Sequence, residues 1–379
     1  MGAFRATRWP KSRPFWLIGC VPGHTLAALT SRPLMVDGYG VGVDITTVAD
    51  DLIVMHDGTT VYRYDGLAHD TPYELHGQWI TTLPRPAGEL LCTFATVNDV
   101  HFGETECGRI DDNPDGPIQR SAPGEDPYPE IMNRGAIAEI DGINPWAVFA
   151  KGDLSQDGQP EEWAAFEHHY RGAFGDRLHV VRGNHDAYKF QSGYDGDHWI
   201  ELPGVCVALM DTVIPGQTTG SLSAQQLAWL DDHAAAADRA VIVMGHHQQW
   251  TGGRPDNHRG ENYFGLNPDA SDGLAEVVKR RLSIIAYTAG HTHRHRVRTM
   301  VNADDVPTIE VGCVKDFPGT WAEYRVYETG VMQVVHRIST PEALSWSERC
   351  RHLYSDFGID YEAYALGRLE DRCFTLSAR

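Results

Sequence analysis

Five short apolar runs alternate with polar, helix-like stretches between residues 89 and 340. Each run has the length and composition of a buried strand, and each is followed by a group of Asp, His, Asn and Gly residues. The runs are Leu91–Val97, Trp146–Ala150, Leu178–Val181, Ala240–Met244 and Ile284–Ala289. Because open α/β sheets hold their active sites at the carboxyl ends of the strands, the alternation predicts an α/β domain over residues 89–340 with a polar site at these ends.

Other stretches of the chain predict helices. Pro160–Phe174 carries aromatic side chains at helical spacing, and Ser223 is the expected N-cap of a further helix. After Pro341 the pattern becomes amphipathic and helical. We therefore expect residues 341–379 to form a helical tail that packs back on the α/β domain.

The first 88 residues have no convincing helical period. Two strand-like pieces, Thr46–Met55 and Thr60–Tyr64, each precede an Asp-Gly turn signal. We therefore expect a small β domain over residues 1–88. Within it, Leu67–Tyr73 resembles the stretch around the tyrosine corner of fibronectin type III domains, which would make this domain fibronectin III-like.

The composition suits one large domain and a smaller one. At 379 residues the chain exceeds an average single domain, and 42% hydrophobic residues can fill a sizeable core. The 52 acidic residues against 32 basic ones give a formal net charge of −20. So acidic a chain repels nucleic acid and anionic membranes, and we expect neither as a partner. The sequence leaves the oligomeric state open, a homo-oligomer included.

Cysteine usage indicates a reducing compartment. The seven cysteines are scattered and form no CxxC pair, so structural disulfides are not expected. The apolar run Phe15–Ile18 is too short for the core of a signal peptide, and no stretch approaches the length of a membrane span. We therefore expect a cytoplasmic protein.

The polar clusters behind the five runs predict a dinuclear metal site. They are Asp99-Val100-His101, Gly152-Asp153, Gly183-Asn184-His185-Asp186, Gly245-His246-His247 and Gly290-His291-Thr292-His293. Two cations about 3.5–4 Å apart can activate water and stabilise a phosphoryl transition state. By chemistry alone, the candidates for the first metal are Asp99, His101 and either His291 or His293. Those for the second metal are Asn184, His246 and the remaining histidine, with Asp153 as the bridge. This nitrogen and oxygen set, without cysteine, suits Mn, Fe or Zn in a catalytic site.

In this order, and over about 200 residues, the five clusters resemble those of the calcineurin-like metallophosphoesterase family. The Gly-Asn-His-Asp block looks closest to the class III cyclic-nucleotide phosphodiesterase and glycerophosphodiesterase branch. The resemblance implies a four-layer α/β/β/α sandwich of two β-sheets flanked by helices, to which the N-terminal β domain and the C-terminal helical tail are added. It also implies attack on phosphorus by a metal-bound hydroxide, without a covalent intermediate.

The resemblance also assigns roles to residues. The ligands it implies for the first metal are Asp99, His101, Asp153 and His293. Those it implies for the second metal are Asp153, Asn184, His246 and His291. His185 would contact the phosphate and help the leaving group to depart. His247 is a rival to His246 as the ligand from its cluster.

One position departs from the family pattern. Many members place an acidic residue three positions after the bridging aspartate, where it orients the histidine that matches His185. This chain has Gln156 there and Asp157 one step later. Either Asp157 takes over this role, or the adjacent Asp186 does, or His185 has only a neutral partner. A neutral partner would make the protonated form of His185 less favourable.

Two segments rich in Gly, Pro, Asp and Asn, 103–128 and 248–272, lie next to the ligand clusters, and loops at the mouth of a site usually decide substrate fit. The candidate substrate-binding residues are His247, Trp250, Arg254, His258 and Tyr263. An arginine could bind a phosphate oxygen, and Trp250 or Tyr263 could stack on a base. Ordinary exposed loop residues are the competing interpretation.

These features together predict a dinuclear-metal-dependent phosphoesterase that hydrolyses small-molecule phosphodiesters of the cyclic-nucleotide or glycerophosphodiester type. Its partner would be a small phosphate ester, and its cofactors two divalent or trivalent ions of Mn, Fe or Zn. A phosphomonoesterase with the same site is the nearest alternative. A nuclease is less favoured because of the acidic balance, and a non-catalytic scaffold because the chain retains every ligand.

Overall fold

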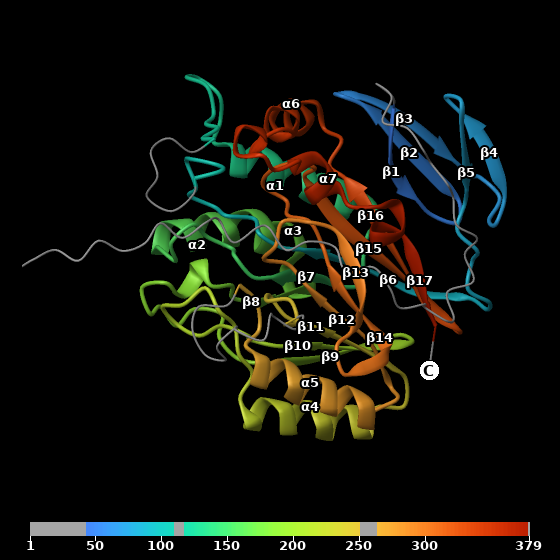
Figure 1. The fold of residues 1–379 in the computed structure, drawn as a ribbon, viewed down its shortest axis with the longest axis vertical. Coiled ribbons are helices and arrows are strands. Elements are labelled where there is room, and N and C mark those ends of the chain that lie inside the picture. Colours follow the sequence, from blue (N-terminus) through green and yellow to red (C-terminus); the bar gives the residue numbers. More distant parts are fainter. Residues whose placement is uncertain (1–42, 110–116, 251–263, 378–379) are drawn as a thin grey trace, which may run out of the picture. The chain divides into compact units, whose positions relative to one another are not determined.

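The structure, a computed structural model, describes residues 43–109, 117–250 and 264–377. Two six-stranded β-sheets form the centre of this described part (Figure 1). The first sheet has the strand order β17 (Phe374–Ser377), β16 (Gly330–Arg337), β15 (Thr320–Tyr327), β6 (Leu90–Val97), β7 (Val148–Lys151) and β8 (Leu178–Val181). The second has the order β13 (Arg296–Met300), β14 (Ala303–Glu310), β12 (Ile284–Ala289), β11 (Ala240–Met244), β10 (Val205–Leu209) and β9 (His198–Leu202).

The five strands expected from the apolar runs are confirmed as β6, β7, β8, β11 and β12. In the first sheet β6, β7 and β8 are parallel neighbours, and in the second β11 and β12 are parallel neighbours. The carboxyl ends of these strands therefore meet at one edge of each sheet. β8, β11 and β12 have the predicted bounds, whereas β6 begins one residue earlier. β7 begins two residues later than predicted and ends one residue later, at Lys151.

Side chains from the two sheets form one shared core. Phe94 of β6 stacks on Tyr324 of β15, with the ring centroids 4.6 Å apart. The same cluster of buried side chains contains Leu209 of β10 and Met244 of β11, from the second sheet. The two sheets therefore pack face to face.

Helices cover the outer faces of both sheets (Figure 1). Met132 of α1 (Tyr128–Gly142) lies in a core cluster with residues of β6, β7 and β8. Leu274 of α5 (Pro268–Arg280) shares another cluster with α4 (Ala224–Ala236) and with β10, β11 and β12. The described part of the chain thus has the layer order helix, sheet, sheet, helix, and the predicted α/β fold class is confirmed.

The helix predicted over Pro160–Phe174 is present in three pieces. They are α2 (Pro160–Phe166), a π-helical turn (Glu167–Arg171) and α3 (Gly172–Phe174). Ser223 caps α4 as expected, because its hydroxyl accepts a hydrogen bond from the Gln226 amide at 3.2 Å. Short 3-10 turns span residues 175–177, 185–187 and 355–357. Among the described residues, no helix combines the length and the apolar character needed to cross a membrane.

The described N-terminal residues form two small antiparallel sheets. One contains β1 (Asp44–Val48), β2 (Leu52–Asp57) and β3 (Thr60–Asp65), and the other is the hairpin of β4 (Pro72–Leu75) and β5 (Gln78–Thr81). The Tyr73 hydroxyl accepts a hydrogen bond from the Ala68 amide at 2.9 Å. Asp50, fully buried, pairs with Arg325 of β15 at 2.6 Å, so these strands pack on the first sheet. The boundary at residue 88 and the fibronectin III-like fold stay predictions.

The C-terminal segment is helical over most of its length, but it does not end as a helix. It contains α6 (Pro341–Cys350), α7 (Tyr361–Leu366) and α8 (Leu369–Arg372), and then enters strand β17. This strand pairs antiparallel with β16, and its Leu376 is buried in the core between the sheets. The prediction of a purely helical tail is therefore corrected, because the last residues complete the edge of the first sheet.

Candidate metal centre

The backbone at the ends of the five strands has an uncommon conformation. Among the predicted ligands, positive φ angles of 48–67° occur at Asp99, His101, Asp153, His291 and His293. A residue with a side chain rarely adopts this region, and such strain costs about 1–3 kcal/mol and is concentrated at functional sites. The repeated left-handed angle turns each chain segment sharply after its strand.

Glycines in the clusters permit the segments to approach one another. A Cβ atom on Gly183 would collide with the backbone nitrogen and carboxylate of Asp153, and one on Gly290 would collide with the carboxylate of Asp99. The glycine in each of these clusters is therefore required by close packing between neighbouring clusters.

Asp99, His101 and His293 form one half of the site. Each offers a ligand atom, and these atoms lie within 4.8 Å of one another. His293 Nε2 is 3.4 Å from Asp99 Oδ1, and His101 Nε2 is 3.6 Å from Asp153 Oδ2. Burial would raise the pKa of Asp99, but the neighbouring His293 imidazole lowers it to about 2. The carboxylate is therefore ionised, as a metal ligand must be.

His246, Asn184 and Asp153 meet in the other half. His246 Nε2 lies 3.0 Å from Asn184 Oδ1 and 3.2 Å from Asp153 Oδ2. The other ring nitrogen, Nδ1, is 2.9 Å from the carbonyl of Lys151, which therefore accepts its proton and turns Nε2 toward the site. Burial would raise the pKa of Asp153, but the imidazoles of His246 and His185 lower it well below its usual range. Asp153 thus touches both halves.

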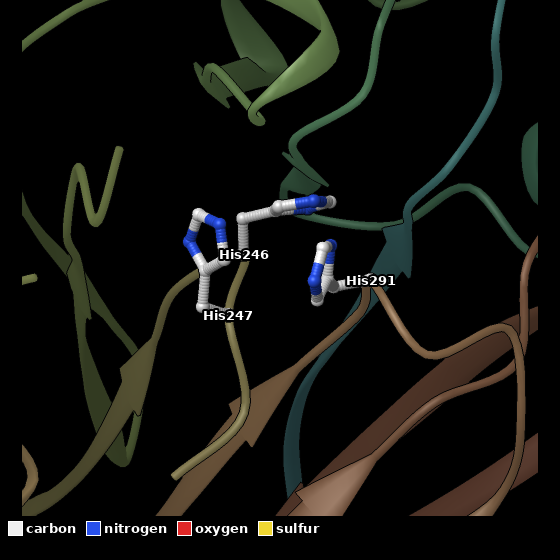
Figure 2. A group of neighbouring side chains, drawn as sticks. All are labelled: His246, His247 and His291. Carbon is white, nitrogen blue, oxygen red and sulfur yellow. The ribbon is translucent and has the colours of Figure 1, made fainter. Parts of the chain in front are cut away.

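Figure 2 shows His246, His247 and His291 with their rings close together. Their ligand nitrogens lie within 4.8 Å of one another. His247 Nδ1 is 2.8 Å from the Thr212 hydroxyl, and the ring is fully buried. His247 therefore lies beside His291, with the ring centroids 4.7 Å apart, and Asp153 and Asn184 lie beside His246.

The polar atoms in this part of the structure fit metal ions. Within the described residues, the buried Nε2 atoms of His101, His247 and His291 have no hydrogen-bond partner. An unpaired buried polar atom costs about 1–3 kcal/mol, and bound cations would satisfy the nitrogens of the predicted ligands His101 and His291. The unpaired Nε2 of His247 keeps this residue a rival to His246 as a ligand. The converging donors are imidazole, carboxylate and amide groups, which suit Mn, Fe or Zn.

His185 lies at the first half of the site. Its ring centroid is 4.6 Å from that of His101, and its backbone amide donates to Asp153 Oδ1 at 2.9 Å. Its Nδ1 donates to the carbonyl of Gln156 at 2.8 Å. His185 therefore has a neutral partner, the third of the three predicted alternatives. Burial lowers the pKa of its imidazole.

The predictions that Asp157 or Asp186 orients His185 are therefore wrong in this structure. The Asp157 carboxylate is partly exposed and pairs with Lys189 instead. Asp186 is fully buried and its carboxylate accepts hydrogen bonds from the amides of Leu154, Ser155 and Gly183. This carboxylate fixes the backbone next to Asp153 and at Gly183. Because both of its oxygens accept these hydrogen bonds, neither is left for the His185 ring.

The predicted substrate-binding residues are only partly described. Trp250 is half-buried, and its backbone amide donates to the Ser271 hydroxyl at 2.9 Å. Arg254, His258 and Tyr263 lie outside the described residues. Their role as a substrate pocket stays a prediction.

Several residues that contact the ligands were not predicted from the sequence. Asn98 donates to Asp99 Oδ2 at 2.6 Å, and the Tyr188 hydroxyl accepts from the Asn184 amide at 2.7 Å. Asp316 Oδ2 lies 3.2 Å from His293 Nδ1. Asn98 adjoins a ligand cluster and could have been found from that position, whereas Asp316 lies far from every cluster in the sequence.

The model of the family described as calcineurin-like phosphoesterase matches residues 92–295. This range is more than half of the chain and contains all five clusters. The chain belongs to the calcineurin-like phosphoesterase family. The resemblance inferred from the clusters is thereby confirmed.

A curated relative of this phosphoesterase is a cAMP/cGMP dual specificity phosphodiesterase of Mycobacterium tuberculosis, 29% identical over 119 residues. The match covers 28% of this chain and 37% of the relative, so it spans little more than a third of the relative's length.

Solved structures with a similar fold include a dimetal phosphatase from Danio rerio and the purple acid phosphatase PPD1 from yellow lupin (Lupinus luteus) seeds. The first is 15% identical, with 66% of this chain and 97% of that chain covered and a TM-score of 0.49. The second is 11% identical, with coverages of 76% and 57% and a TM-score of 0.48. Membership of the family rests on the sequence match across the five clusters.

Proposed function

We propose that this phosphoesterase hydrolyses small-molecule phosphodiesters at a dinuclear metal centre. The ligands of the first metal would be Asp99, His101, Asp153 and His293. The ligands of the second would be Asp153, Asn184, His246 and His291. The observation that supports this most is the place of Asp153, whose Oδ2 lies 3.6 Å from His101 Nε2 and 3.2 Å from His246 Nε2. When bound, two Mn, Fe or Zn ions would polarise the phosphoryl oxygens and activate water.

His185 is the candidate for proton transfer in this proposal. Because its Nδ1–H donates to the Gln156 carbonyl, Nε2 is the ring nitrogen left to contact the phosphate or the leaving oxygen. The ring lies beside His101 and Asp153, whose ligand atoms are within 4.8 Å of its own. In its protonated form His185 would donate a proton to the leaving group, and in its neutral form it would only position the phosphate.

Charge near the site supports a diester rather than a monoester. A phosphomonoester carries close to two negative charges near neutral pH, whereas a diester carries one. The two lysines buried near the ligands are already engaged: Lys151 Nζ donates to the Thr288 hydroxyl at 3.1 Å, and Lys315 Nζ pairs with Glu104 at 2.7 Å. The curated phosphodiesterase relative points the same way. Phosphomonoester hydrolysis at the same site is the second candidate.

Hydrolysis of bis(p-nitrophenyl) phosphate beside p-nitrophenyl phosphate tests this proposal, with metal-stripped protein refilled with Mn²⁺. We expect metal-dependent turnover of the diester, a loss of at least about 100-fold in kcat/KM with Asn184→Ala, and little change with Asn144→Ala. Asn144 is a matched control because it precedes β7 at the opposite end from Asp153. A preference for the monoester would support the second candidate. No turnover of either ester with metal bound would contradict both.

A cytoplasmic location is also proposed, on the evidence of the cysteines. The six cysteines in the described residues are buried and free, as expected in a reducing compartment. Cell fractionation with alkylation of free thiols would test it, and recovery of the protein with oxidised cysteines would contradict it. The acidic composition supports small molecules rather than nucleic acid or membranes as partners.

A further inference from the structure

Asp316 is a buried carboxylate on the far side of a predicted metal ligand. It lies in the loop between β14 and β15, and only 2% of its surface is exposed. Its Oδ2 is 3.2 Å from His293 Nδ1, while His293 Nε2 is 3.4 Å from Asp99 Oδ1. The imidazole is thus held between two carboxylates. Hydrogen bonding of one ring nitrogen to a carboxylate orients the other toward a metal.

The orientation of Asp316 is fixed by residues outside the five clusters. Its Oδ1 accepts a hydrogen bond from the Tyr361 hydroxyl of α7 at 2.8 Å and one from the Cys313 thiol at 3.0 Å. Tyr361 is itself only 3% exposed. Its hydroxyl group is therefore shielded from water and hydrogen-bonds to the Asp316 carboxylate instead. Helix α7 therefore fixes the carboxylate that contacts His293.

The same helix also binds the backbone on both sides of His293. The Tyr364 hydroxyl donates to the carbonyl of Thr292 at 2.9 Å, and the amide of His295 donates to the carbonyl of Ala365 at 3.1 Å. Three hydrogen bonds of α7 therefore reach Asp316 and the residues on both sides of His293. A helix that served only to cover the sheet would not need polar contacts to this loop.

Helix α6 supports the other histidine of the same half. Trp346 Nε1 donates to the carbonyl of Lys315 at 2.8 Å, and Lys315 Nζ pairs with Glu104 at 2.7 Å. Glu104 Oε2 lies 3.9 Å from His101 Nδ1. The loop that carries Lys315 and Asp316 thus contacts His293 directly and the Glu104 neighbour of His101 through Lys315, and α6 and α7 both bind this loop.

We propose that Asp316 is a positioning residue for His293, and that α7 fixes it through Tyr361, so that the C-terminal segment belongs to the first metal site. This inference rests on the proposed dinuclear centre. Loss of such a carboxylate lowers metal affinity by about 10- to 100-fold. The effect is expected at the first metal and not at the second, because Asn184 and His246 have no contact with Asp316 in the described part of the chain.

Titration of metal-free protein with Mn²⁺, followed by the electron paramagnetic resonance signal of the free ion, tests the proposal. The Asn184→Ala background weakens the second site and leaves the first as the tighter one. In this background we expect Asp316→Asn to raise the Kd of the remaining site by about 10- to 100-fold and Tyr361→Phe to raise it by a smaller factor. Tyr354→Phe is the matched control, since its ring packs 5.0 Å from that of Tyr361.

The outcomes separate the inference from the function on which it rests. An unchanged Mn²⁺ Kd in Asp316→Asn and Tyr361→Phe, in protein that binds two ions before substitution, would overturn the inference alone. A lower melting temperature of the metal-free variants with unchanged Kd would show that Asp316 is only structural. Absence of Mn²⁺ binding by the unsubstituted protein would overturn the dinuclear centre and the inference together. If Asp316→Asn fails to fold, Tyr361→Phe decides.

Discussion

Asp153 connects its own cluster to three of the other four through a single carboxylate. Its Oδ1 accepts from the backbone amide of His185 at 2.9 Å, and its Oδ2 faces the Nε2 atoms of His101 and His246. With a φ of 50°, its backbone turns so that both oxygens enter the site. A bridging role therefore requires this residue type in this backbone conformation, and replacing it by any neutral side chain would remove the charge that both halves share.

Tyr188 supports the side chain of Asn184, a proposed ligand of the second metal. Its hydroxyl holds the Asn184 amide nitrogen at 2.7 Å, which turns the amide oxygen toward His246. Tyr188→Phe should weaken Mn²⁺ binding at the second site by about 10-fold and leave the first site unchanged, because a partner of a ligand typically contributes this much. Stepwise Mn²⁺ titration measures it.

Tyr194→Phe is the control for this prediction, because its hydroxyl donates to Glu167 at 2.8 Å and not to a ligand. Equal Mn²⁺ affinities in Tyr188→Phe and the unsubstituted protein would show that Asn184 needs no such partner.

The candidate ligands could be proposed from the sequence more readily than the residues that contact them. Asp99, Asp153 and His246 each follow a strand within two residues, so a strand pattern and a chemical type suffice to find them. Asp316 lies 23 residues after His293, and the two meet only because the loop after β14 folds back. Asp157 shows the opposite case. Its position in the sequence suggested that it orients His185, but its carboxylate pairs with Lys189 instead.

At the scale of elements, the pair of β15 and β16 carries a buried charge cluster. Glu323 of β15 lies 2.8 Å from His336 of β16 and 2.8 Å from Arg325. Burial would raise the pKa of Glu323, but the hydrogen bond with His336 and the charge of Arg325 lower it from 4.5 to about 2. The pair of strands is therefore stabilised by an ionised carboxylate.

A lowered carboxyl pKa contributes stability above the unfolded pKa of 4.5, and this contribution is lost as the pH falls toward 2. Glu323→Gln should therefore lower the free energy of unfolding by about 2–3 kcal/mol at pH 7, and the difference from the unsubstituted protein should shrink by about 1 kcal/mol between pH 6 and pH 4. Urea unfolding at these pH values measures it. The exposed Glu328→Gln is the control, and a difference that does not change with pH would contradict the role of the charge.

The elements themselves were predictable to different degrees. β8, β11 and β12 have the predicted bounds because buried parallel strands are continuous apolar runs that end at polar clusters. β17 was not predicted because its four residues, Phe374–Ser377, have no distinctive pattern of hydrophobic and polar positions. Their strand conformation depends on pairing with β16. Local sequence determines the first kind of strand and a distant partner determines the second.

At the scale of the whole molecule, the proposed metal centre lies where the two sheets meet. Asp99 and Asp153 follow strands of the first sheet, whereas His246 and His291 follow strands of the second. Since the described residues form one compact unit, ions bound among these side chains would connect the two sheets directly. Metal binding and global stability should then be linked.

Removal of the metal ions should lower the stability of the whole protein. Each ion that binds only the folded protein adds about 4 kcal/mol to the free energy of unfolding at a concentration 1,000-fold above its Kd. Protein stripped with a chelator should therefore melt several degrees below the same protein with saturating Mn²⁺, as measured by scanning calorimetry, and added Mn²⁺ should restore the melting temperature. In Asp153→Asn, which lacks the carboxylate common to both halves, most of this rise should disappear, because neither ion then has its full set of ligands. An equal rise in Asp153→Asn would mean that the stabilising ions bind elsewhere in the molecule.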